Sequence, residues 1–148
     1  MKVSDLMTRH VEFIGGEELV RDAAVLMGEL DVGALPVGAA ERLDGIVTDR
    51  DILYRVVARG LDPCRVRVRE VVSRPVVFCG EDETLQAAMD LMAAHHVRRL
   101  PVRNESGLVT GWITLADLSR QLLVGSEPLQ AALRELTEGD GLGPVRGR

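Results

Sequence analysis

Apolar residues along the chain follow two different spacings. Over residues 17–30 they recur three or four positions apart, which predicts an amphipathic helix. Short runs of apolar and β-prone residues at 11–14, 34–37 and 43–48 instead predict strands. A second helix is predicted over 49–58. The first part of the chain therefore combines a few short strands with two helices.

The second part of the chain repeats the first. VSDLMT at 3–8 matches VREVVS at 68–73, and LPV at 35–37 matches LPV at 100–102, both at an offset of 65. Matches at a fixed offset indicate an internal duplication. Each six-residue lead segment is predicted to contain a short helix, at 3–7 in the first and at 68–72 in the second. The remaining elements of the second part are a strand at 76–79, a helix that Thr84 caps, strands at 99–102 and 109–114, and a helix at 115–123.

Each part also carries one copy of a seven-residue phrase, GIVTDRD at 45–51 and GWITLAD at 111–117. Two β-prone residues precede the threonine and a helical pattern follows it, so each threonine should lie where a strand ends and a helix begins. Each aspartate should then lie one turn inside the helix. The pairs concerned are Thr48 with Asp51 and Thr114 with Asp117.

Two interpretations of these pairs are open. A threonine followed three residues later by an acid resembles a capping box, in which the side chains satisfy free backbone N–H groups at about 0.5–2 kcal/mol per cap. Alternatively, the carboxylate accepts both hydrogens of a ribose diol and the hydroxyl holds a sugar or phosphate oxygen. The second copy favours ligand binding, because a cap alone does not require the same phrase twice.

DVGALPV, GIVTDRDIL and HHVRRLPV together resemble a pair of CBS domains, the family named for cystathionine β-synthase. The resemblance covers roughly residues 1–123 and is strongest to small stand-alone proteins of two such domains. It implies an α/β (α+β) fold of two β-α-β-β-α repeats packed with pseudo-two-fold symmetry. It also implies a homodimer, and clefts that bind AMP, ADP, ATP or S-adenosylmethionine as a regulatory ligand.

The pattern divides the chain into five segments. Asp-Pro and a change of periodicity mark a linker at 61–67 between the repeats. Ser126 is placed to cap a helix outside the repeat, and the Gly-rich end is expected to be disordered. The segments are repeat 1 at 1–60, the linker at 61–67, repeat 2 at 68–124, a C-terminal helical extension at 125–137 and a tail at 138–148.

Basic residues near the phrases are candidates for phosphate binding. Arg50 lies inside the first phrase, and Arg98 and Arg99 precede the second LPV. Because adjacent strand residues face opposite ways, we expect at most one of Arg98 and Arg99 to point into a given cleft. The two clefts should differ in charge, and one should bind a phosphorylated ligand better. Val32 and Val97 complete the set of candidate ligand-binding residues, and Trp112 either lines or fills a cleft.

Composition narrows the possible functions. The net charge of −5 argues against nucleic-acid binding, and no apolar run is long enough to span a membrane. The N-terminus lacks the apolar core of a signal peptide, so a cytoplasmic protein is expected. Hydrophobic residues make up 46% of the chain and aromatic residues 3%, which predicts an aliphatic core. A repeat of about 60 residues is marginal alone, so the two repeats should fold as one unit.

No motif indicates an enzyme, a required cofactor or a metal site. His95 and His96 project about 100° apart on a helix, which is poor geometry for joint ligation. Cys64 and Cys79 are expected to be free thiols in a reducing compartment.

We therefore expect a regulatory module that senses an adenosine ligand and passes its occupancy to a partner protein. A ligand-free dimerisation or scaffold module, and a redox-responsive interaction protein using Cys64 and Cys79, are the alternatives.

Overall fold

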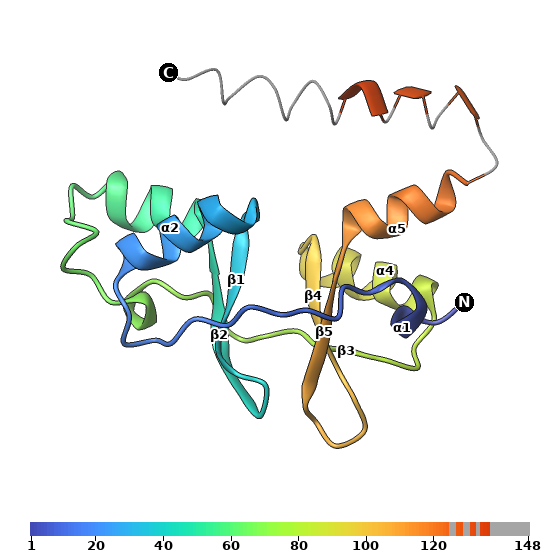
Figure 1. Cartoon of the computed structure of the whole chain (residues 1–148), viewed down its shortest axis with the longest axis horizontal. Coiled ribbons are helices and arrows are strands. Elements are labelled where there is room, and N and C mark those ends of the chain that lie inside the picture. The colour runs from blue at the N-terminus through green and yellow to red at the C-terminus, as the bar shows by residue number, and fades with distance from the viewer. Residues whose placement is uncertain (125–126, 129–130, 133, 137–148) are drawn as a thin grey trace.

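The computed structural model describes residues 1–124, 127–128, 131–132 and 134–136. Two halves, each a small sheet with helices, lie side by side, and their strands are adjacent at the centre of the molecule (Figure 1). This arrangement confirms the predicted α+β class. The first half contains α2 (Val20–Leu30), β1 (Ala34–Ala39), β2 (Arg42–Thr48) and α3 (Asp49–Ile52). The second half contains β3 (Cys79–Gly80), α4 (Leu85–His95), β4 (Arg99–Arg103), β5 (Val109–Thr114) and α5 (Leu115–Leu122).

The two hairpins have the same register. β1 and β2 pair antiparallel with Ala34 opposite Thr48, and β4 and β5 pair antiparallel with Arg99 opposite Thr114. Each phrase threonine is therefore the last residue of its strand, opposite the residue that precedes LPV. The strand-to-helix junction predicted for both phrases is confirmed.

The first strand of each repeat is shorter than predicted. Only Ile14 of the expected strand at 11–14 pairs, through a parallel bridge to Val37, and the strand expected at 76–79 is reduced to β3. The LPV proline explains both losses. The ladder would need an N–H from Pro36 or Pro101 to continue toward the N-terminus, and proline has none.

The lead segments are exchanged between the halves. Helix α1 (Val3–Leu6) belongs to the first repeat, yet Val3 and Met7 are buried in the core of the second half. Helix η2 (Val68–Glu70) opens the second repeat, yet Val68 and Val72 are buried in the core of the first half. The chain accordingly crosses between the halves twice, first between α1 and α2 and again between η2 and β3 (Figure 1). Each core is completed by the other repeat.

The linker also caps a helix. Thr84 caps α4 as predicted, accepting a hydrogen bond from the Ala87 N–H at 3.1 Å. The equivalent residue at the start of α2 is Leu19, whose side chain has no hydrogen-bond donor or acceptor. There, the Val20 and Arg21 N–H groups donate to the Val66 and Pro63 carbonyls of the linker, at 2.9 and 3.1 Å.

Three helices differ in detail from the prediction. Helix α2 begins at Val20 rather than at residue 17, because Glu18 closes a turn onto the Gly15 N–H. The helix predicted over 49–58 is α3 followed by a π-helical turn, η1 (Leu53–Val57). The second lead segment forms a single 3₁₀ turn, η2, rather than a helix over 68–72.

The predicted C-terminal extension is described only in part. Residues 127–128, 131–132 and 134–136 are helical, whereas the rest of 125–137 and the predicted tail at 138–148 lie outside the described residues. Among the helices that the structure does describe, none combines the length and the apolar character needed to cross a membrane.

Candidate functional site

Both phrases form complete capping boxes. The Asp51 N–H donates to Thr48 Oγ1 at 3.0 Å, and the Thr48 N–H donates to Asp51 Oδ2 at 2.9 Å. The second phrase repeats the pattern, at 3.2 Å to Thr114 Oγ1 and 3.0 Å to Asp117 Oδ2. The capping interpretation is therefore confirmed. It still leaves one carboxylate oxygen and one hydroxyl proton of each pair for other partners.

The remaining carboxylate oxygen has a different partner in each aspartate. Asp51 is buried, accepts a bond from the Ser73 hydroxyl at 3.0 Å, and lies 3.8 Å from the Arg55 guanidinium. Asp117 Oδ1 instead accepts from Arg120, whose side chain is exposed. Asp117 lines the second of the two clefts described below, whereas Asp51 lines neither of them.

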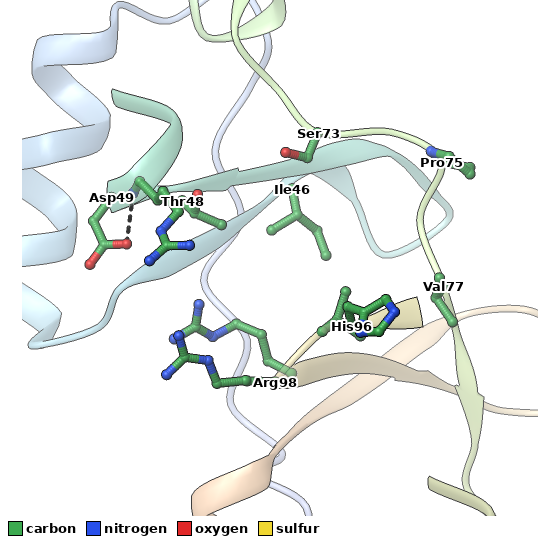
Figure 2. A pocket seen from close by; sticks show the side chains of 11 residues that line it. Ile46, Thr48, Asp49, Ser73, Pro75, Val77, His96 and Arg98 are labelled. Atoms are coloured by element: carbon green, nitrogen blue, oxygen red, sulfur yellow. Dashed lines mark hydrogen bonds between the residues drawn. The ribbon is translucent and has the colours of Figure 1, made fainter. Parts of the chain in front are cut away.

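The first cleft has a volume of about 450 Å³ and lies between the first phrase and the start of β4. Figure 2 shows Thr48 and Asp49 on one side, Arg98 on the other, and Val77 and His96 at one end. Both repeats contribute to this cleft, because the second repeat supplies its lead segment and the residues before LPV. The cleft is lined by Ile46, Thr48, Asp49, Arg50, Ser73, Pro75, Val77, His96, Val97, Arg98 and Arg99.

Three arginines and one aspartate make the first cleft cationic. Arg50 and Arg98 are exposed, and Arg50 lies over the Tyr54 ring at 5.8 Å. Burial lowers the pKa of Arg99, and Arg98 lowers it further, while the Asp49 carboxylate acts in the opposite direction. A concentration of guanidinium groups on one cavity favours an anionic ligand such as a phosphate.

The expectation that only one of Arg98 and Arg99 reaches a given cleft is wrong, because both line the first cleft. Strand alternation does not apply to this pair. Strand β4 begins at Arg99, so Arg98 belongs to the turn that follows α4 and is free of the pleat. Arg99 also lines the second cleft.

The second cleft has a volume of about 480 Å³ and is acidic. Glu12, Asp31 and Asp117 line it together with Arg99, and the His10 imidazole lies 2.7 Å from Glu12. The expectation that the clefts differ in charge is thus confirmed. Trp112 lines this cleft and leaves it open. The lining residues are Thr8, His10, Val11, Glu12, Leu30–Pro36, Arg99, Trp112, Thr114, Ala116 and Asp117.

The structure therefore divides the candidate residues between the clefts. Sequence reasoning missed Glu12 and Asp31 of the second cleft and Ser73 of the first. The duplication carried a signal for Ser73, because it matches Thr8 at the offset of 65 and these two residues line equivalent cavities. Thr48, Arg50, Val97, Arg98 and Arg99 line the first cleft, Val32, Arg99, Thr114 and Asp117 line the second, and Asp51 lines neither.

The two cysteines are both free. Burial, followed by the hydrogen bond to Glu83, raises the pKa of Cys79 to about 12. A thiol of that pKa is protonated at neutral pH and is a poor nucleophile. Cys64 is exposed on the linker. Within the described ranges, no group of three or more metal-ligating side chains comes together.

Comparison with known proteins places these features in a family. The family model described as "CBS domain" matches residues 3–58 and 68–124. Hypoxic response protein 1 of Mycobacterium tuberculosis is 39% identical over 119 residues, covering 80% of this chain and 82% of that protein. Its crystal structure, described as having two coordinated zinc ions, has a TM-score of 0.71, with 37% identity over 81% of this chain and 98% of that chain.

Two further solved structures have the same fold. A putative signal-transduction protein with CBS domains from Burkholderia ambifaria gives a TM-score of 0.79 at 28% identity, covering 86% of this chain and 97% of that chain. A hexameric CBS-CP12 protein from bloom-forming cyanobacteria gives 0.74 at 28% identity, covering 96% and 88%.

Proposed function

The chain belongs to the CBS-domain family, and from this premise we propose that it is a regulatory module whose first cleft binds a phosphorylated adenosine ligand. AMP, ADP and ATP fit this proposal better than S-adenosylmethionine, because the cleft is cationic. The observation that carries the proposal is the set of three arginines on one 450 Å³ cavity beside Thr48. A volume of this size lies within the usual range for small-molecule sites, about 300–1,000 Å³.

The roles of the lining residues follow from their chemistry. Arg50, Arg98 and Arg99 would hold phosphate oxygens, and the Thr48 hydroxyl, whose oxygen accepts the cap hydrogen bond, keeps its proton for a ligand oxygen. Asp51 would reach a ribose only after its bond to Ser73 had broken. Phosphate binding, rather than recognition of the ribose by Asp51, is therefore the main contribution we assign to the first cleft.

Occupancy of this cleft would act on both repeats. Thr48 and Arg50 come from the first repeat and Arg98 and Arg99 from the second, so a ligand between them favours the arrangement in which the two sides are close. A ligand shifts such an equilibrium only by its differential affinity for the two arrangements. We assign the output to a partner protein rather than to catalysis.

A homodimer is part of this proposal. Apolar side chains are exposed on the helices that follow both phrases, and a second copy of the chain would cover them. They are Leu53, Tyr54 and Val57 after the first phrase and Leu115 and Leu122 after the second. The hexameric relative supports assembly in general rather than a particular interface.

Calorimetric titration with ATP, AMP and S-adenosylmethionine tests the ligand. We expect saturable binding of the phosphorylated nucleotides, weaker binding of S-adenosylmethionine, and a higher melting temperature in the presence of ATP. If saturating ATP and AMP gave neither heat nor a shift in melting temperature, the sensing function would be rejected.

The scaffold alternative is favoured by one observation, which is that both capping boxes are complete without any ligand. Under that alternative the arginines contribute nothing to binding. The chain would then dimerise with the same affinity with and without ATP in sedimentation equilibrium experiments.

A further inference from the structure

Arg99 lies between the two clefts. In the part of the chain that the structure describes, it is the residue that lines both cavities. It is the first residue of β4 and pairs with Thr114, while Pro101 pairs with Trp112. Arg99 and Trp112 are therefore diagonal neighbours on one face of the β4–β5 pair. The guanidinium stands where the first cleft ends and the second begins.

The guanidinium is close to a carboxylate at this junction. A Cβ atom added to Gly33 would lie 3.1 Å from Asp49 Oδ2 and 3.3 Å from Arg99 Nη2, so both side chains reach over the same glycine. Among the described residues, the Arg99 guanidinium nevertheless forms no hydrogen bond or ion pair of its own. Its five N–H donors are thus available to a ligand on either side.

The charges around Arg99 differ on its two sides. Without it, the first cleft still has Arg50 and Arg98 against Asp49. Without it, the second cleft keeps its carboxylates and loses its arginine. Partial burial makes the position of this charge matter more, since water screens it less. One arginine therefore contributes its charge to both cavities.

We propose that Arg99 couples the two clefts, so that an anionic ligand in the first cleft recruits the guanidinium and makes the second cleft unfavourable for another anion. This inference rests on the proposed function of the first cleft. One chain then takes up one polyphosphate nucleotide with high affinity. Because coupling is reciprocal, an anion bound in the second cleft would weaken anion binding in the first by the same factor.

The sole tryptophan makes this coupling measurable. Trp112 lines the second cleft, so its emission should report the departure of its neighbour Arg99 when ATP binds in the first cleft. In the unmodified chain, we expect one ATP per chain by calorimetry and a change in Trp112 emission with the same dissociation constant. Arg99→Gln should weaken ATP binding about tenfold or more and abolish the emission change at saturation.

Arg98→Gln is the matched control, because Arg98 lines only the first cleft. It should weaken ATP binding to a similar degree but keep the full emission change at saturation. Arg99→Lys, which keeps the charge, should restore part of the response. Circular dichroism and the melting temperature of each variant establish that it is folded.

The outcomes separate the two claims. An absence of ATP binding to the unmodified chain would overturn both the proposed function and the coupling. An Arg98→Gln variant with unchanged affinity would place ATP outside the first cleft, with the same consequence. If ATP binds and Arg98→Gln weakens it, but Arg99→Gln keeps the emission change or two ATP molecules bind with equal affinity, the coupling alone is overturned.

Discussion

The two clefts are built from equivalent positions of the duplicated sequence and have opposite charge. Thr48 and Thr114 occupy the same place, as do Ser73 and Thr8. Arg98 corresponds to Gly33, Arg50 to Ala116, His96 to Asp31 and Val77 to Glu12. The backbone and its caps are thus shared, whereas the side chains on the cavity walls are not. Ligand selectivity can change in such a duplication without any change of fold.

The two clefts also differ in the hydrogen-bond partners of the phrase aspartates, Asp51 and Asp117. In the first half, Ser73 of the exchanged lead segment donates to Asp51, whose carboxylate is buried. The backbone of Thr8, the equivalent of Ser73, pairs with Trp112 just as that of Ser73 pairs with Ile46, but the carboxylate of Asp117 pairs with Arg120 instead. Arg50 and Arg98 therefore line the first cleft, whereas Asp117 lines the second. The first cleft suits a phosphate, and the second retains the acid that could accept hydrogen bonds from a ribose.

The largest expected effect comes from removing the two arginines of the first cleft whose equivalents in the second cleft are neutral. The double substitution Arg50→Ala and Arg98→Ala should weaken ATP binding about 100-fold or more, because two charge-assisted contacts of about 1.5–3 kcal/mol each are lost. Isothermal titration calorimetry measures this directly. Arg42→Ala with Arg65→Ala is the control, since it makes the same change in net charge at positions outside both clefts. Equal losses in the two double variants would show that only net charge matters.

The next effect concerns the glycine that opens each phrase. A Cβ at Gly45 would lie 2.9 Å from the Ser73 carbonyl oxygen, and a Cβ at Gly111 would lie 2.9 Å from the Thr8 carbonyl oxygen. Because glycine has no side chain, the exchanged lead segment can pack closely against the strand at each of these positions. Gly45→Ala and Gly111→Ala should each cost about 1–3 kcal/mol of unfolding free energy in urea titrations, because the lead segment must move away.

Gly28 supplies the matched control for these glycines. A Cβ there would meet no atom within 4 Å in the described part of the chain, and the residue lies inside α2. Gly28→Ala should therefore stabilise the protein by about 0.5–1 kcal/mol. Wild-type stability of both phrase variants would contradict the close approach of the lead segments.

A smaller effect is the difference in unfolding free energy between variants of the two aspartates. Asp51→Ala should cost about 2–3 kcal/mol, because it removes a cap and also leaves the Ser73 hydroxyl without its acceptor. Asp117→Ala should cost about 1 kcal/mol, since its second partner, Arg120, is exposed. Denaturant unfolding of both variants gives the comparison. Ser73→Ala should cost more than Thr8→Ala, and the reverse order would refute the role given to Ser73.

Features that depend on neighbours along the chain could be predicted from the sequence. The threonine caps follow from a strand meeting a helix, and both lie where the phrase predicts. The LPV strands were also found, since their apolar residues face two packed layers. The same LPV segments also affect strands that are distant in the sequence. Their prolines shorten the neighbouring strand, which the periodicity of residues 11–14 cannot show.

Features that depend on contacts between the two repeats could not be predicted from the sequence. An offset of 65 relates Ser73 to Thr8, but it does not say that Ser73 contacts Asp51 across the exchange. The same offset pairs Arg99 with Ala34, a short side chain that reaches only one cavity. The sharing of Arg99 between the clefts follows from the packing of the halves and from the length of one side chain, neither of which is periodic.

The smallest effect near neutral pH comes from Cys79, whose equivalent in the first repeat is the buried Ile14. The pKa of its thiol rises from 9.0 to about 12 on folding, so the folded state keeps a proton that the unfolded state loses as the pH rises above 9. Stability should therefore be constant below pH 8, fall by about 0.4 kcal/mol at pH 9, and then fall by about 1.4 kcal/mol per pH unit toward pH 12.

Cys79→Val isolates this contribution, because it retains an apolar side chain and removes the titrating group, as Ile14 does in the first repeat. The difference in unfolding free energy between the unmodified chain and Cys79→Val should vary with pH as described, while Cys64→Ser, at an exposed thiol, should leave the profile unchanged. A thiol reagent should modify Cys64 in the folded protein and Cys79 only on unfolding. Rapid modification of Cys79 in the native state would contradict its burial in the core of the second half.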